Sequence, residues 1–294
     1  MPPLPKDTAT DAAPVLRRGH APDMSAADIP VGSLWVGKEL RWLDKLALRS
    51  FAHRGHPVTL FHTHELTDPQ IEGVTLRPAA EVYDYSDLLL NSVTPTVFAD
   101  LFRLHLMRDT NLTWVDTDCL CYRPLSPKDG YLIGYESPTT VNNAVLRLPK
   151  DSAALALLIK HLNDPEFIPP WLKWSRRKKL MELPEGEQLL AAARMVPTVF
   201  GPQALTWALN ETAEIDHALP RHVLNPVHWS MADIYFNPHG GVEGWLRDDT
   251  QCVHLYASRI RAAHRRSIPY EGSFIANFAT QVDHDFGGQP FRQT

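Results

Sequence analysis

The sequence has few cysteines and no excess of positive charge, and each shortage excludes a class of protein. Its 294 residues include three cysteines, too few and odd in number for a disulfide framework. The formal net charge of −5 argues against nucleic-acid binding, because neutralising phosphates requires a basic surface. With 44% hydrophobic and 21% charged residues, the composition is that of an ordinary globular protein.

Long hydrophobic runs are also missing. No apolar stretch approaches the roughly 20 residues that span a bilayer, and the first residues, MPPLPKDTATDAAP, lack the apolar core of a signal peptide. We therefore expect a cytoplasmic protein without a transmembrane segment. Residues 1–28 are rich in Pro, Ala and Asp without periodicity, which predicts a disordered N-terminal segment.

Apolar periodicity from residue 29 onwards predicts alternating strands and helices. A strand over 31–36, a helix over 40–52 and a strand over 58–61 form a βαβ opening, which favours a parallel sheet. Thr94 followed by Pro95 is a typical helix start, and that helix leads into a strand at 112–115. We expect further strands near 74–76, 131–135, 144–148 and 252–256, and further helices near 152–162, 185–195 and 202–210.

The pattern WVDTD at residues 114–118 joins an apolar strand to two carboxylates. Asp116 and Asp118 project from one side of an extended chain, about 7 Å apart, because alternate side chains share a face. Open α/β sheets bind ligands at the carboxyl ends of their strands, and hard oxygen ligands suit Mg²⁺ or Mn²⁺. The pair predicts a divalent-cation site of the kind shared with a substrate diphosphate.

A second D-x-D pattern, Asp283 and Asp285, serves as an internal control for chance. It follows no apolar strand, and we interpret it as incidental. The first pair differs because the preceding helix carries Asp100 and Arg103 three positions apart, and hence on one face. One interpretation of these two residues is a solvated ion pair, but their apolar neighbours favour a site.

The stretch FADLFRLHLM–x₆–WVDTDCLCYRPL resembles the signature of metal-dependent glycosyltransferases of the GT-A fold. It is most similar to the family with a sugar-binding region containing a DXD motif, related to α-1,4-galactosyltransferases, mannosyltransferases that initiate outer-chain mannan, and glucosylating toxins. The chain departs from the family pattern at a glycine pair, where Asn111 and Leu112 stand, and has Trp114 in place of Tyr. These departures affect the turn more than the chemistry.

The resemblance also implies a role for each site residue. Trp35 would stack on the nucleotide base, and His254 would complete the metal site. The donor-binding residues implied are Trp35, Asp100, Arg103, Asp116, Thr117, Asn142, Asn143 and Ser258. The catalytic residues implied are Arg103, Asp116 and Asp118, and the ligands of a Mn²⁺ or Mg²⁺ cofactor are Asp116, Asp118 and His254. Trp35 as a plain core residue and His254 as a structural histidine stay open as alternatives.

The resulting expectation is one α/β domain over residues 29–270, with a Rossmann-like mixed sheet flanked by helices in the GT-A fold, and a flexible tail at 271–294. It would be a hexosyltransferase that uses a nucleotide sugar, with UDP favoured over GDP, and that retains the anomeric configuration. The acceptor would be a glycan, a lipid-linked molecule or a protein. The alternatives are a nucleotidyltransferase or nucleotide-sugar hydrolase with the same aspartate–metal site, or a nucleotide-sugar-binding protein without activity.

For three groups of residues, the sequence is compatible with two different roles. The basic run at 176–179 is either a solvated face or a dock for an anionic acceptor or a membrane surface, which would make the protein a peripheral one. The arginines after His254 either clamp the diphosphate or face solvent; they are Arg259, Arg261, Arg265 and Arg266. The three cysteines are either buried small residues or, with His254, zinc ligands; they are Cys119, Cys121 and Cys252.

Overall fold

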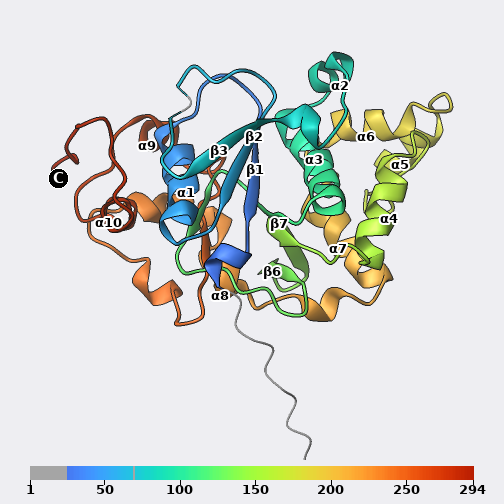
Figure 1. Ribbon diagram of the computed structural model, residues 1–294. Coiled ribbons are helices and arrows are strands. Elements are labelled where there is room, and N and C mark those ends of the chain that lie inside the picture. Colours follow the sequence, from blue (N-terminus) through green and yellow to red (C-terminus); the bar gives the residue numbers. More distant parts are fainter. Residues whose placement is uncertain (1–24, 69) are drawn as a thin grey trace, which may run out of the picture.

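The computed structural model describes residues 25–68 and 70–294 of the chain (Figure 1). Most of the predicted disordered segment therefore lies outside the described residues. Its last residues form a 3₁₀ helix at Ala26–Asp28, directly before the first strand. Within the described ranges, no helix combines the length and the apolar character needed to cross a membrane.

A mixed six-stranded sheet forms the centre of the molecule, in the order β3-β2-β1-β4-β7-β6. The first four strands in that order are parallel to one another, whereas β7 runs antiparallel to β4 and β6 runs antiparallel to β7. The strand bounds are β1 Val31–Trp35, β2 Val58–His62, β3 Val74–Pro78, β4 Thr113–Val115, β6 Leu132–Ser137 and β7 Thr140–Arg147. The predicted mixed α/β fold is confirmed, and its arrangement is consistent with the GT-A fold.

A second, two-stranded sheet lies beside the first. It pairs β5 (Cys119–Cys121) with β8 (Cys252–His254) in antiparallel register, so that Cys119 stands opposite His254. The strand β8 lies within the range predicted at 252–256, but β5 was not predicted. This small sheet brings the end of the WVDTD segment next to a part of the chain far away in sequence.

Helices cover both faces of the central sheet. On one face, Leu34, Phe61 and Trp114 join a core with α3, α4, α6 and α7; on the other, Val31 and Leu60 join a core with α1. Alternate side chains of a strand point to opposite faces, so these strands are buried on both sides. The helix bounds are α1 Trp42–His53, α2 Asp87–Ser92, α3 Pro95–Asp109, α4 Ala153–Leu162, α5 Trp174–Met181, α6 Gln188–Met195, α7 Pro202–Glu211, α8 Arg221–Leu224, α9 Ala262–Arg266 and α10 Phe274–Gln281.

Helix α3 begins as its sequence predicts. The Thr94 hydroxyl accepts a hydrogen bond from the backbone N–H of Val97, and Pro95 occupies the first turn, which satisfies one of the unpaired donors at a helix start. Most of the helix is buried, and its buried polar residues are Asp100 and Arg103, at 2% and 4% exposure. Their ion pair is therefore not a solvated one.

The C-terminal residues differ from the predicted flexible tail. Residues 271–294 contain α10, which buries Phe274, Ile275, Phe278 and Ala279 in a core shared with α1. The Ser273 hydroxyl caps this helix by accepting from Ala276 N–H. The helix spans eight residues between glycine-containing segments, so its periodicity is too short to stand out in the sequence. The basic run at 176–179 lies in α5, a helix that was not predicted from the sequence.

Candidate functional site

A cleft of about 900 Å³ opens at the carboxyl ends of β1 and β4, and its size is typical of a small-molecule site. All the predicted site residues except Asp100 line it. They are Trp35 from β1, Arg103 from α3, Asp116, Thr117 and Asp118 from the turn between β4 and β5, Asn142 and Asn143 from β7, His254 from β8, and Ser258 from the segment that follows.

Two donors hold the first aspartate of the motif. Asp116 Oδ1 accepts hydrogen bonds from Trp114 Nε1 at 2.7 Å and from Arg103 Nη2 at 3.2 Å. The Arg103 guanidinium also donates to the Asn143 carbonyl oxygen at 2.6 Å and lies 4.8 Å from the Trp114 ring centroid. Trp114 therefore fixes the motif through its N–H. Burial raises the pKa of Asp116, and the charge of Arg103 opposes that rise.

Asp100 lies behind the cleft rather than in its wall. Its Oδ1 accepts from Asn143 Nδ2 at 3.0 Å and stands 3.4 Å from Arg103 Nη2. Its Oδ2 is buried with no hydrogen-bond partner among the described residues, and a Cβ at Gly201 would lie 3.3 Å from it. Burial raises the pKa of Asp100 to about 6, against the opposing charge of Arg103. In this position the carboxyl group orients Arg103 and Asn143.

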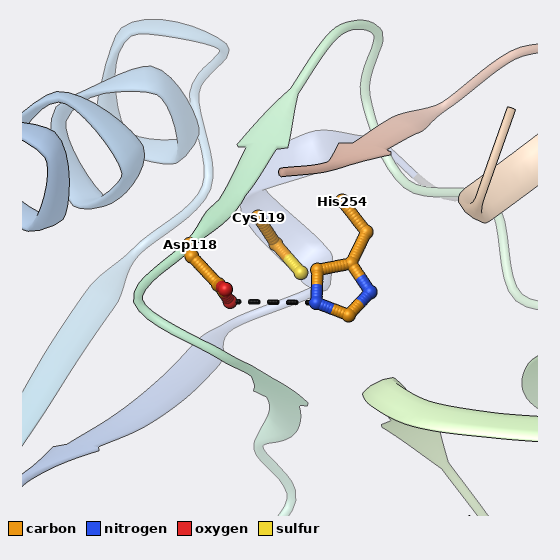
Figure 2. Close-up of side chains that lie close together, drawn as sticks. All are labelled: Asp118, Cys119 and His254. Carbon is orange, nitrogen blue, oxygen red and sulfur yellow. Dashed lines mark ion pairs between the residues drawn. The ribbon is translucent and has the colours of Figure 1, made fainter. Parts of the chain in front are cut away.

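The second aspartate of the motif faces a histidine. Asp118 Oδ1 lies 3.6 Å from His254 Nε2 (Figure 2). Its Oδ2 accepts a hydrogen bond from the backbone N–H of Ala257 at 2.7 Å. Burial alone would raise the pKa of Asp118, but the charge of His254 and the hydrogen bond from Ala257 outweigh it and lower the pKa. Burial lowers the pKa of His254, and the charge of Asp118 overcomes that effect and raises it.

Asn225 sets the orientation of the histidine ring, and the sequence did not point to it. Its Nδ2 donates to the Tyr135 carbonyl oxygen at 3.2 Å, which leaves its Oδ1 facing His254 Nδ1 at 3.3 Å. With Nδ1 donating to Asn225, Nε2 faces Asp118 and carries a proton in the charged ring; in the neutral ring its lone pair is free to bind a metal ion. The ring also stacks on Tyr256, with centroids 3.8 Å apart.

An ion pair between the half-buried Arg41 and the buried Asp44 supports the middle residue of the motif. Asp44 is fully buried and accepts from Arg41 Nε at 2.8 Å and Nη2 at 2.6 Å. The Thr117 hydroxyl donates to the same carboxylate at 3.2 Å. Arg41 also lines the cleft, 5.6 Å from the centroid of the Trp35 ring. The only local signal for this network is Asp44 at the third position of a helix, where it accepts from the Arg41 backbone N–H.

Two of the four arginines after His254 reach the cleft. Arg259 and Arg265 line it, and the Arg259 guanidinium lies 4.8 Å from the Trp229 ring centroid. Arg261 instead pairs with Asp233 at 2.9 Å. The carboxylate of Glu136, which the sequence did not single out, also faces the cleft and accepts from Asn142 Nδ2 at 2.6 Å.

The best candidate metal ligands are Asp118 and His254. Among the described residues, one group of potential ligands has all its donor atoms within 4.8 Å of one another, and it comprises Asp118, Cys119 and His254 (Figure 2). Asp116, predicted as a third ligand, is not part of this group. Cys119 is buried in the core, where burial and the neighbouring Cys252 raise the pKa of its thiol. A carboxylate oxygen suits Mn²⁺ or Mg²⁺, and an imidazole nitrogen beside it favours a transition-metal ion such as Mn²⁺ over Mg²⁺, whereas a thiol that keeps its proton is a poor ligand.

The structure does not bring together the four residues that were considered as alternative zinc ligands. Cys121 and Cys252 stand opposite each other in the small sheet and are buried in the core with Cys119. These three thiols and His254 do not form a group of potential ligands in the part of the chain that is described. The cysteines are therefore the buried small residues of the first interpretation.

Comparison with known proteins adds a distant likeness in structure. No family model matches the chain, and no curated protein matches it. Among solved structures, the chain is similar to one described as "PaToxG Glycosyltransferase", with a TM-score of 0.38 and 14% identity, covering 65% of this chain and 73% of that chain. A likeness of this size identifies no family and assigns no role to any residue.

Proposed function

We propose that this chain is a metal-dependent glycosyltransferase that moves a hexose from a nucleotide sugar to an acceptor hydroxyl. The observation that supports this proposal is the content of one cleft. An aromatic ring (Trp35), a fixed guanidinium (Arg103) and a carboxylate–imidazole pair (Asp118 and His254) all line it. Together with the amides of Asn142 and Asn143, which also line the cleft, these groups match the three parts of a nucleotide sugar: a base that stacks, a diphosphate that carries charge, and a sugar with hydroxyls to be oriented.

Asp118 and His254 would hold a Mn²⁺ or Mg²⁺ ion, which neutralises the charge that develops on the leaving diphosphate. Asp116 would act through water or the ribose, because Trp114 and Arg103 already occupy its Oδ1. Arg103, held by hydrogen bonds on both sides, needs no reorganisation when the diphosphate departs.

The remaining polar side chains of the cleft would position the donor. Asn142 and Asn143 present amides at the sugar end, while Thr117 and Ser258 offer hydroxyls near the phosphates. Such fixed positioning removes much of the entropic part of a reaction barrier. By the family resemblance, UDP-sugars are favoured over GDP-sugars and the anomeric configuration is retained. The acceptor is a glycan, a lipid-linked molecule or a protein.

Thermal unfolding with UDP and with GDP, each with and without Mn²⁺, tests the proposal. We expect UDP with Mn²⁺ to raise the melting temperature by about 2–5 °C, since a ligand at a hundred times its dissociation constant stabilises by about 2.7 kcal/mol. Asp118→Asn should abolish the part of the shift that needs Mn²⁺, and with it transfer to any acceptor, because it removes a charged ligand.

The matched control is Asp283→Asn, which changes the same residue type in the incidental D-x-D pattern. Asp283 does not line the cleft, and Asn tolerates its positive φ of 51°. This variant should respond to nucleotide and Mn²⁺ as the natural chain does. A chain that neither nucleotide stabilises, or an Mn²⁺ response that survives Asp118→Asn, would contradict the proposal.

A further inference from the structure

Helix α5 presents a surface that plays no part in the cleft. It lies at the edge of the molecule, at the right of Figure 1, and none of its residues lines the cleft. It carries the two most exposed large hydrophobic side chains of the described residues, Trp174 at 64% and Met181 at 50%. An apolar surface of this kind needs an explanation, because exposed Trp is uncommon on a soluble domain.

The apolar side chains share one helix face with basic ones. Positions 174, 177, 178 and 181 follow the i, i+3, i+4, i+7 spacing of a single face. Arg177 and Lys178 therefore stand between Trp174 and Met181, and the Arg177 guanidinium lies 5.7 Å from the Trp174 ring centroid. The face is apolar at its two ends and cationic in the middle.

The charge of this segment is opposite to that of the whole chain. Residues 173–181 contain no acidic residue and five basic ones, in a chain whose formal net charge is −5. The basic residues are Lys173, Arg176, Arg177, Lys178 and Lys179. Exposed glutamates follow at positions 182, 185 and 187, so the positive surface is confined to the helix.

The exposure of Trp174 does not come from loose packing. The same segment buries Leu172 and Leu180, at 5% and 0% exposure. Its other tryptophan, Trp171, donates from Nε1 to the Val199 carbonyl oxygen at 2.8 Å and packs 5.1 Å from the Trp207 ring centroid. The helix is thus held on the protein by its inner side chains, and Trp174 and Met181 point outward from a fixed support.

We propose that α5 binds the surface of a lipid bilayer that contains anionic phospholipids. Trp partitions into the headgroup region, where its ring meets acyl chains and its N–H stays hydrated. Long basic side chains lay their stems along the same boundary while their charges contact lipid phosphates, and each such charge strengthens binding to an anionic leaflet. This interaction stands independently of the reaction that the cleft performs.

Co-sedimentation of the full chain with vesicles tests this assignment. We expect binding to phosphatidylcholine vesicles that contain about a third phosphatidylserine, and little to phosphatidylcholine alone. Lys178→Gln combined with Lys179→Gln should weaken binding roughly tenfold or more, from the loss of two charges near the surface. Trp174→Ser combined with Met181→Ser should also weaken it severalfold, with the melting temperature unchanged because both side chains are exposed.

The matched charge control is Lys150→Gln combined with Lys160→Gln, which removes two exposed lysines from elsewhere. This pair should bind vesicles like the natural chain. Three results would overturn the assignment: no binding to anionic vesicles, an equal loss in the control pair, or full binding after the Trp174 and Met181 changes. Binding to polyglutamate without binding to vesicles would also overturn it, and would point to an acidic protein as the partner of α5.

Discussion

The two oxygens of Asp118 have different partners. Ala257 N–H bonds to Oδ2, and Oδ1 faces His254, so one oxygen fixes the carboxylate while the other remains available to a ligand. The hydrogen bonds of Asp116 fall on one oxygen, because Trp114 and Arg103 both donate to its Oδ1. The two aspartates of one motif thus have different roles, which the D-x-D spacing alone does not reveal.

The folding stability of the chain should depend on pH through the titration of Asp100. Its pKa is raised to about 6 in the folded state, against about 3.9 in an unfolded chain. The unfolded state therefore loses this proton first, and folding stability falls as pH rises from about 4 to about 6, by about 3 kcal/mol in all. Asp100→Asn cannot titrate and should escape this loss.

Urea unfolding of both chains at pH 4 and at pH 7 measures the effect. At pH 4 the protonated acid resembles an amide, so the two chains should differ little. At pH 7 Asp100→Asn should be the more stable chain by up to about 3 kcal/mol. A stability difference that is equal at the two pH values would show that the Asp100 pKa is not raised.

At the scale of elements, α3 can be recognised from the sequence, whereas α10 cannot. Helix α3 has a cap, a proline and fifteen residues, and it begins at Pro95 as its sequence predicts. Helix α10 has eight residues, and most of its stabilisation comes from the core shared with α1. A short helix of this kind is defined by packing rather than by its own propensity.

Phe278→Ala in α10 should cost about 3–5 kcal/mol in the free energy of unfolding, because the side chain is 1% exposed and its removal leaves a cavity. Urea denaturation measures this cost. Met231→Ala is a control with an apolar side chain at 38% exposure, and it should cost less than about 1 kcal/mol. A cost for Phe278→Ala as small as that of the control would favour the flexible tail that the sequence predicted.

The same contrast explains how much of the fold and of the site could be predicted. The alternating strands and helices of the central sheet follow from local periodicity, and Arg103, Asp116 and Asp118 follow from one continuous motif. Asn225 and Asp44 could not be found, because each acts through a residue tens of positions away. Strand β5 was missed for the same reason, since its three residues are recognisable only beside β8.

At the scale of the whole molecule, the cleft lies where separate apolar cores meet. The core around α3, α4 and α7 supplies its wall at Arg103 and Trp114. The core around α1 and α10 supports the opposite side, where Tyr256 and Ala257 are buried. A ligand in the cleft contacts both sides, and its binding energy therefore couples the two halves.

Hydrogen exchange should show this coupling. We expect UDP with Mn²⁺ to slow backbone exchange in residues 113–119 and in residues 252–259 together, because Leu255 and Ala257 N–H both donate to Asp118. Residues 174–181, outside the cleft, provide the control and should exchange as before. Protection limited to one of the two segments would show that the ligand does not bridge the cores.

The hydrogen bond from Ala257 to Asp118 joins residues 139 positions apart. During synthesis, the WVDTD segment therefore exists long before the strand that completes its surroundings. Because a contact of such long range forms only after most of the chain is available, Asp118 lacks its partners His254 and Ala257 for much of translation. The partners of Asp116, Trp114 and Arg103, are synthesised before it. A product truncated before β8 would therefore keep the recognisable motif but lack His254 and Ala257, which are the partners of Asp118.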